Sequence, residues 1–145
     1  MLNYIEGNLL DADCPIVHCV NAQGRMASGV AKAIRAKYPQ VYEDYMQDDL
    51  LLGNVIVSYE WHDIKVFSVV GQKYYGYDGK RYVSYEALKE GFAKIRGLCL
   101  WHNIPKIAMP LIGAGLAGGD WDTIEDIIKT VFTDVDVDIY KLPGA

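Results

Sequence analysis

The sequence twice repeats one order of segments: a short apolar run, a glycine-rich loop and an amphipathic stretch. The first apolar run, residues 16–20, contains one histidine and is typical of a strand covered on both faces. Residues 30–38 then carry apolar side chains at the spacing of one helix face. The second run, residues 106–109, leads into a loop with four glycines in seven residues and then into an apolar helical stripe over residues 124–132. A glycine loop between a strand and a helix can present backbone N–H groups to an anion.

The other segments complete an alternation of strands and helices. The hydrophobic patterns predict strands at 2–5 and 137–142, a hairpin of 54–59 with 64–70, and helices at 41–51 and 85–102. Ser84 is the predicted N-cap of the long helix, and Asp122 with Glu125 has the spacing of a capping box for the last one. We therefore predict one domain, residues 1–145, with a three-layer α/β/α sandwich around a central mixed β-sheet. If the two loop-bearing strands are neighbours, both loops open at the edge where α/β sheets bind ligands.

Composition excludes several classes of partner. The net charge of −5, from 19 acidic and 14 basic residues, argues against strong nucleic-acid binding and against anionic membrane surfaces. Three cysteines without a close pair favour a reducing compartment, and no signal peptide or membrane span is visible. We expect a cytoplasmic monomer with no metal and no cofactor.

Three segments in order carry a resemblance to a known family. They are residues 7–9, residues 17–21 with 25–31, and residues 110–121. Together they resemble the macro domain family, which binds ADP-ribose, over essentially the whole chain. Within the family, the chain looks closest to the branch that includes terminal ADP-ribose protein glycohydrolase and the yeast-type ADP-ribose-1″-phosphate phosphatases. The ligand implied by the resemblance is ADP-ribose or ADP-ribose-1″-phosphate, with an ADP-ribosylated protein as a further possible partner.

The resemblance also implies which residues bind the ligand. Asn8 stands where the family usually has an aspartate that accepts from the adenine amino group, and Asn21 matches the asparagine that hydrogen-bonds the distal ribose. Each asparagine has an alternative as a turn or capping residue, and Arg25 is either a phosphate clamp or a solvated side chain at the loop rim. The expected ligand-binding residues are Asn8, Leu9, Asn21, Gly24, Arg25, Met26, Ala27, Ser28, Gly29, Val30, Gln72, Ile112, Gly113, Ala114, Gly115, Leu116, Ala117 and Gly118.

The glycohydrolase branch implies a lysine that attacks the ribose anomeric carbon and an aspartate that assists it. Here Gln72 stands at the lysine position and Ala117 at the aspartate position. Lys73 is one residue away, and in an extended segment its side chain points to the opposite face unless a one-residue bulge intervenes. We therefore do not expect chemistry through a lysyl adduct.

The phosphatase branch requires a group that activates water or accepts phosphate. The candidate catalytic residues are His18, Asn21 and Asp120; the alternatives are a buried core histidine for His18 and a helix N-cap for Asp120. His62 and His102 are expected at the surface, away from the loops. We favour a hydrolase acting on ADP-ribose-1″-phosphate or on ADP-ribosyl esters. The alternative is a non-catalytic module that only binds ADP-ribose.

Overall fold

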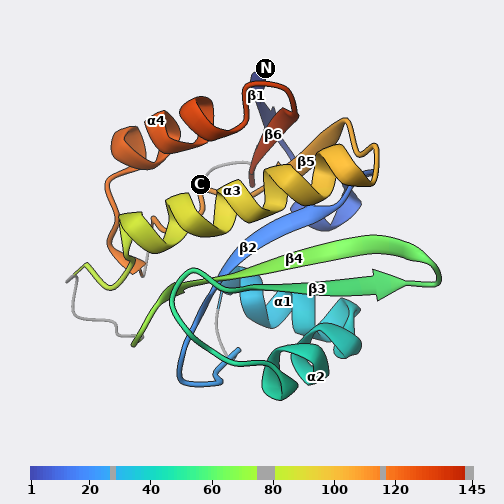
Figure 1. The fold of residues 1–145 in the computed structure, drawn as a ribbon, viewed down its shortest axis with the longest axis vertical. Helices are drawn as coiled ribbons and strands as arrows, with labels where there is room; N and C mark the ends of the chain where they lie inside the picture. The colour runs from blue at the N-terminus through green and yellow to red at the C-terminus, as the bar shows by residue number, and fades with distance from the viewer. Residues whose placement is uncertain (27–28, 75–80, 115–116, 143–145) are drawn as a thin grey trace.

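The computed structural model describes residues 1–26, 29–74, 81–114 and 117–142, and six of its strands form one mixed sheet (Figure 1). Neighbouring strands are parallel except for one antiparallel hairpin at an edge of the sheet, as the sequence predicts. In spatial order the strands are β1 (Leu2–Glu6), β6 (Asp136–Lys141), β5 (Lys106–Met109), β2 (Ile16–Asn21), β4 (Asp63–Gln72) and β3 (Val55–Glu60).

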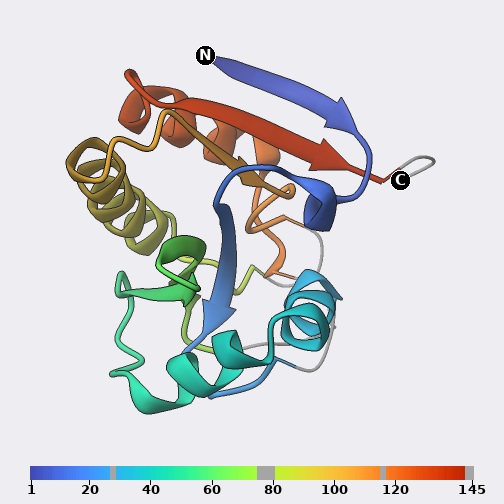
Figure 2. The same cartoon turned by 90° about the vertical axis from the view of Figure 1, so that its right-hand side faces the viewer.

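Two pairs of helices cover the two faces of the sheet (Figures 1 and 2). The helices α1 (Gly29–Lys37) and α2 (Pro39–Gln47) enclose one apolar core, and α3 (Tyr85–Trp101) and α4 (Trp121–Val131) enclose the other. The three-layer α/β/α sandwich is thereby confirmed. None of the helices in the described part of the chain is long and apolar enough to cross a membrane.

The helix starts follow local capping chemistry, and two of them differ from the predicted positions. Ser84 caps α3 as predicted, because its Oγ accepts from the Ala87 N–H at 3.1 Å. The cap of α4 is Asp120, as the N-cap alternative for this residue predicts, and not Asp122: the Asp120 Oδ2 accepts from the Thr123 N–H at 3.1 Å, so the helix begins two residues earlier than a cap at Asp122 would place it. The helix predicted at 41–51 begins at Pro39 instead, since proline suits the first helical turn, and ends at Gln47.

The strand ends form a step that positions both glycine loops. β2 lies between β5 and β4, so the carboxyl ends of these three parallel strands meet at one edge, as anticipated for neighbouring strands. Ile16 is in register with Ala108, so β5 ends while β2 runs on for four more residues, about 13 Å at the usual rise per strand residue. The loop after β5 therefore has room beside the last part of β2.

A β-bulge shapes the end of β4. Val20 pairs with Val70, but Asn21 pairs with Gln72, so Gly71 is the extra residue. The Ala22 N–H donates to the Gln72 carbonyl at 2.9 Å. The end of β4 is thus joined directly to the start of the loop after β2.

Candidate functional site

The loop after β2 is held in shape by the side chain of Asn21. The Asn21 Oδ1 accepts from the Gln23 N–H at 3.1 Å and from the Arg25 N–H at 3.2 Å, while its Nδ2 donates to the Arg25 carbonyl at 2.9 Å. Asn21 is buried, whereas the Arg25 side chain is exposed at the rim. The capping alternative for Asn21 is therefore present in the structure, and its contact with a ribose stays a prediction.

Tyr45 of α2 hydrogen-bonds Asn21 at the start of the same loop. Its ring is fully buried, and its hydroxyl group lies 3.0 Å from the Asn21 Oδ1 and also hydrogen-bonds the Asn21 carbonyl oxygen. Burial raises the pKa of the Tyr45 hydroxyl to about 12, so this group remains a hydrogen-bond donor at neutral pH. The sequence reasoning missed this residue, because its contact with Asn21 joins different elements of the fold.

The loop after β5 is closed by its own backbone. The Gly119 N–H donates to the Gly113 carbonyl at 2.9 Å, and the Ala117 carbonyl accepts from the N–H groups of Tyr82 at 2.7 Å and Val83 at 3.1 Å. These bonds tie the loop to the segment that leads into α3. Ile112 at its start is buried. The loop runs into α4, where Asp120 caps the Thr123 N–H and Asp122 lies in the first turn.

Asn8 makes a local contact at the end of β1. Its Oδ1 accepts from the Leu10 N–H at 3.0 Å and caps a short 3-10 helix, Leu9–Asp11, that the sequence prediction did not include. Leu9 is buried beneath this turn. The turn alternative therefore accounts for the Asn8 side chain as it stands, and an adenine contact remains a prediction.

Gln72 lies beside Asn21, at the position where the resemblance implies a lysine. Its Nε2 donates to the Tyr74 carbonyl at 2.8 Å, which leaves the Oε1 as an acceptor. Lys73 is exposed, with its Nζ 5.5 Å from the centre of the Tyr74 ring. The bulge at Gly71 precedes Gln72 and brings Gln72, not Lys73, into register with Asn21.

His18 lies inside the sheet layer. It is 1% exposed, its Nε2 is 2.7 Å from the Ser68 Oγ on β4, and its Nδ1 has no hydrogen-bond partner among the described residues. Burial lowers the pKa of His18 to about 4, so the imidazole is neutral at pH 7. Asp120, in contrast, is exposed and accepts from both the N–H and the Oγ1 of Thr123. The catalytic roles of His18, Asn21 and Asp120 stay predictions.

The buried imidazole makes folding stability sensitive to acid. The pKa of His18 is lower in the folded protein than in the unfolded chain, so the unfolded chain binds the extra proton and stability falls as the pH drops from about 6.5 to about 4. The resulting loss in the free energy of unfolding approaches about 3 kcal/mol as the pH nears 4. Urea denaturation at pH 7 and pH 4.5 should show a smaller loss in His18→Gln than in the parent. His62→Gln, which changes an exposed histidine, serves as the control; an unchanged pH difference in His18→Gln would contradict this origin.

The expected ligand residues that the structure describes lie along the carboxyl edge of the sheet. Four of them, Ala27, Ser28, Gly115 and Leu116, lie outside the described residues. The expected ligand residues that the structure describes stand at or after the ends of β1, β2, β4 and β5: Asn8, Leu9, Asn21, Gly24, Arg25, Met26, Gly29, Val30, Gln72, Ile112, Gly113, Ala114, Ala117 and Gly118.

Comparisons with known proteins agree with this architecture. The family model for the macro domain matches residues 17–128. The ADP-ribose glycohydrolase OARD1 of Bos taurus is 29% identical over 97% of this chain and 91% of its own length. The DNA ADP-ribosyl glycohydrolase of Thermus aquaticus is 27% identical over 89% of this chain and 37% of its own length.

Solved structures show the same fold. A protein from Bacteroides thetaiotaomicron superposes with a TM-score of 0.86 at 25% identity, covering 97% of this chain and 99% of that one. The macrodomain of Thermus aquaticus DarG superposes with a TM-score of 0.82 at 24% identity, covering 97% of this chain and 98% of that one.

Proposed function

The chain belongs to the macro domain family, and from that premise we propose that it binds ADP-ribose at the carboxyl edge of its sheet and hydrolyses an ADP-ribosyl derivative. The observation that carries the proposal is the pair of glycine loops after the neighbouring parallel strands β2 and β5. Backbone N–H groups at loops and helix starts carry partial positive charge, so a protein with a net charge of −5 can still hold a pyrophosphate there. The relatives named above are hydrolases of ADP-ribosyl groups, which supports the same activity here.

The chemistry proposed is attack by water on the anomeric carbon of the distal ribose. Gln72 and Ala117 stand where a lysine and an aspartate would form and assist an adduct, so no covalent intermediate through those positions is expected. The Oε1 of Gln72, which has no hydrogen-bond partner among the described residues, can accept a hydrogen bond from the attacking water and orient it without removing its proton. Glycosidic cleavage passes through a transition state with positive charge on the ribose, so a leaving group that departs as a stable anion needs little acid catalysis.

Both candidate substrates carry a leaving group that departs as a stable anion. ADP-ribose-1″-phosphate and an ADP-ribosyl ester of a carboxylate both lose an anion when the bond between the anomeric carbon and oxygen breaks. In each case water supplies the new carbon–oxygen bond and releases a proton to solvent. We propose these anomeric esters as the substrate class, because neither His18, which is neutral and buried, nor Asp120, which caps a helix, is placed as a strong acid or base.

The test is to incubate the protein with ADP-ribose-1″-phosphate and, separately, with a glutamate-linked ADP-ribosylated protein, both in ¹⁸O-labelled water. The proposal expects at least one substrate to be consumed and the released phosphate or carboxylate to carry no label, because the bond that breaks joins the anomeric carbon to oxygen. Label in phosphate instead would contradict attack at carbon. His18→Gln in the same assay tests the catalytic assignment of His18, and undiminished turnover would place it in the core only.

A second function, binding without chemistry, is favoured by one observation: the two reactive side chains implied by the glycohydrolase branch are both missing. Saturable binding of ADP-ribose with no consumption of any of the substrates would support this reading over the hydrolase. Consumption abolished together with binding in one loop variant would support the hydrolase.

ADP-ribose is expected to raise the melting temperature, and AMP much less, because AMP lacks the distal ribose and one phosphate that the two loops are proposed to hold. At a ligand concentration one hundred times the dissociation constant, the added stability is about 2.7 kcal/mol. Differential scanning fluorimetry measures the shift. No shift with millimolar ADP-ribose would remove the binding proposal.

Tyr45→Phe is expected to weaken ADP-ribose binding by about tenfold. The change keeps the buried ring but removes the hydroxyl group that fixes Asn21, and a lost buried hydrogen bond costs about 1–2 kcal/mol. Isothermal titration calorimetry measures the affinity. Tyr42→Phe is the matched control on α2: the Tyr42 ring packs under Arg35, 3.5 Å from its guanidinium carbon, and against the Tyr45 ring, both of which phenylalanine keeps, and among the described residues its hydroxyl makes no hydrogen bond to Asn21. Equal affinity in both variants would show that the hydroxyl of Tyr45 does not position the site.

A further inference from the structure

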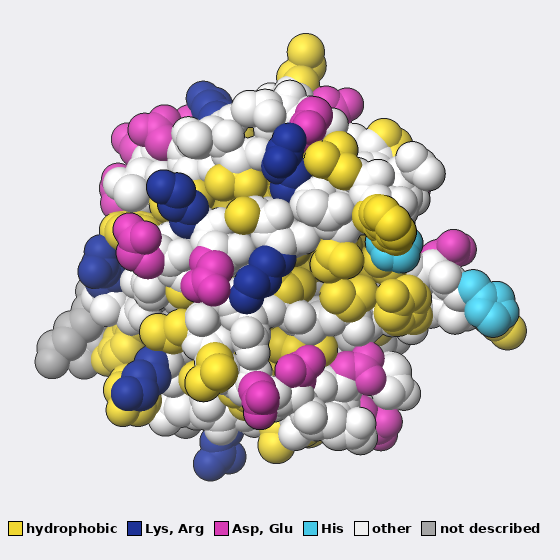
Figure 3. Space-filling model, viewed as in Figure 1, with side chains coloured by type: hydrophobic (Ala, Val, Ile, Leu, Met, Phe, Trp, Pro, Cys, Tyr) yellow, Lys and Arg dark blue, Asp and Glu magenta, His cyan; other side chains and the backbone are white. Residues whose placement is uncertain are grey.

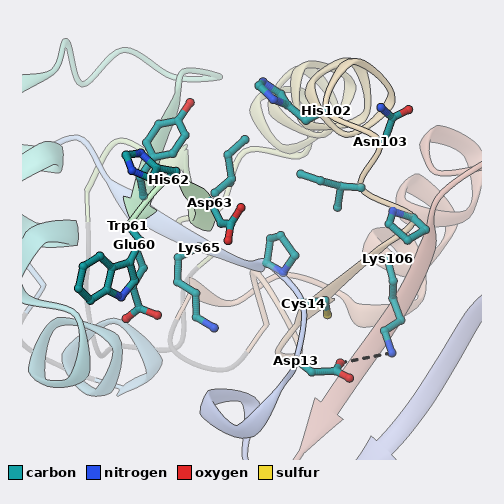
Figure 4. A pocket seen from close by; sticks show the side chains of 15 residues that line it. Asp13, Cys14, Glu60, Trp61, His62, Asp63, Lys65, His102, Asn103 and Lys106 are labelled. Atoms are coloured by element: carbon teal, nitrogen blue, oxygen red, sulfur yellow. Dashed lines mark ion pairs between the residues drawn. The ribbon is translucent and has the colours of Figure 1, made fainter.

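A pocket lies at the edge of the sheet opposite the glycine loops. It has a volume of about 600 Å³ and is formed where β2, β4 and β5 begin and where β3 and α3 end (Figure 4). Its lining runs from Trp61 and Glu60 at one end to Asp13 and Lys106 at the other (Figure 4). This volume is in the range that accommodates a ligand or a short peptide segment.

The tip of the β3–β4 hairpin presents an aromatic side chain in a strained position. Trp61 is 90% exposed and has a φ of 61°, in the region that favours glycine or asparagine at such turns. Tyr59 beside it is 51% exposed, and Trp101, next to the pocket residue His102, is 82% exposed. Figure 3 shows hydrophobic side chains gathered on this face over the end of α3 and the hairpin. An exposed apolar patch with a strained residue is typical of an interaction surface.

The charges around this aromatic tip are predominantly negative. Glu60 and Asp63 lie directly opposite one another as the last pair of the hairpin, an arrangement of like charges that is unfavourable by itself. Among the described residues, no ion pair engages either carboxylate. At the far end, Lys106 is already shared between Asp13 at 3.6 Å and Asp138 at 3.3 Å.

Lys65 also lines the pocket. Lys65 has its Nζ 5.6 Å from the centre of the Tyr38 ring, and among the described residues no ion pair joins it to Glu60 or Asp63. Cations bind well between carboxylates and the faces of exposed aromatic rings. The pocket is thus complementary to a positively charged group that also has an apolar part.

We propose that this pocket docks an extended basic segment of a partner protein, with an arginine or lysine side chain held between Trp61 and the Glu60–Asp63 pair. Nucleic acid and anionic membranes are disfavoured by the same carboxylates. A second copy of this chain would bring the same negative charges together, since a symmetric contact pairs each patch with itself. The inference is independent of the proposed function, because the pocket lies at the other edge of the sheet.

The test uses an alternating arginine–leucine hexapeptide, capped at both ends, and its glutamate–leucine counterpart. The three tryptophan indole N–H signals report the contact in ¹H–¹⁵N NMR spectra. The signal of Trp61 is expected to shift with the basic peptide and not with the acidic one. The signal of Trp121, whose indole donates to the Tyr4 hydroxyl on the far side of α3, is the internal reference and should not move.

Two variants decide between this site and general attraction to an acidic protein. Glu60→Gln with Asp63→Asn is expected to weaken binding of the basic peptide by at least fivefold. Glu43→Gln with Asp49→Asn makes the same change in net charge at exposed positions elsewhere and should leave the affinity unchanged. Equal weakening in both double variants would overturn the proposal.

A single variant tests the contribution of the Trp61 ring to peptide binding without disturbing the fold. Trp61→Asn keeps a residue suited to the positive φ, so the melting temperature should stay the same or rise while peptide affinity falls at least fivefold. ADP-ribose binding should be unchanged in this variant. Undiminished peptide affinity in Trp61→Asn would exclude the pocket as the docking site, whatever the outcome of the ADP-ribose experiments.

Discussion

Gly29→Glu is expected to abolish ADP-ribose binding, with at least about a hundredfold loss of affinity, or nearly 3 kcal/mol, while the protein still folds. Gly29 is the first residue of α1 and is exposed, and a Cβ atom built on it meets no atom within 4 Å. The glutamate therefore finds space, but it places a negative charge at the helix start proposed to face the phosphates.

Gly29→Ala is the matched control for this variant. Gly29 has a φ of 60°, so any other residue there costs about 1 kcal/mol of backbone strain. Alanine carries the strain without the charge, and the difference in affinity between the two variants isolates the electrostatic effect. Calorimetric titration with ADP-ribose and urea denaturation measure the two contributions. Retention of affinity in Gly29→Glu would show that the loop does not bind the phosphates.

Gly119→Ala is expected to lower both stability and ADP-ribose affinity, the first by about 2–4 kcal/mol and the second by more than tenfold. A Cβ atom at Gly119 would lie 2.5 Å from the Gly113 carbonyl oxygen, which is backbone and part of the bond that closes the loop. It would also lie 2.7 Å from the Val83 Cγ1. The loop must therefore open or shift, and overpacking of this kind costs a few kcal/mol.

Gly97→Ala gives the opposite result and serves as the control for Gly119→Ala. Gly97 is exposed on α3, and a Cβ atom there meets nothing within 4 Å. Alanine should raise the free energy of unfolding by about 0.5–1 kcal/mol through helix propensity alone, with unchanged affinity. A Gly119→Ala protein as stable and as active as the parent would mean that the closed loop is not needed for binding.

Much of the fold could be predicted from the sequence, because strand and helix periodicities are local. Asp120 and Asp122 were both candidate caps for α4, and only the structure shows that Asp120 is the one that reaches the Thr123 N–H. The short 3-10 helix after β1 was not predicted, because three residues are too few to show a hydrophobic period.

The candidate site was predictable in its loops but not in its supports. The glycines mark where the backbone turns, and their positions after β2 and β5 suffice to place both loops at one edge. The hydroxyl of Tyr45 reaches Asn21 across 24 positions of sequence, and the Ser68 hydroxyl reaches His18 across 50. No periodicity reports such pairs, because they depend on how α2 and β4 pack around β2.

The length of β4 fixes the distance that any partner in contact with both edges of the sheet must span. β4 begins at Asp63, beside the hairpin tip, and ends at Gln72, beside Asn21. Nine residue steps at the usual strand rise span about 30 Å. A protein docked at the pocket beside Trp61 would raise the local concentration of its own modified residue at the glycine loops only if about ten or more residues separate its basic segment from that modified residue. A shorter spacer could not reach both edges of the sheet.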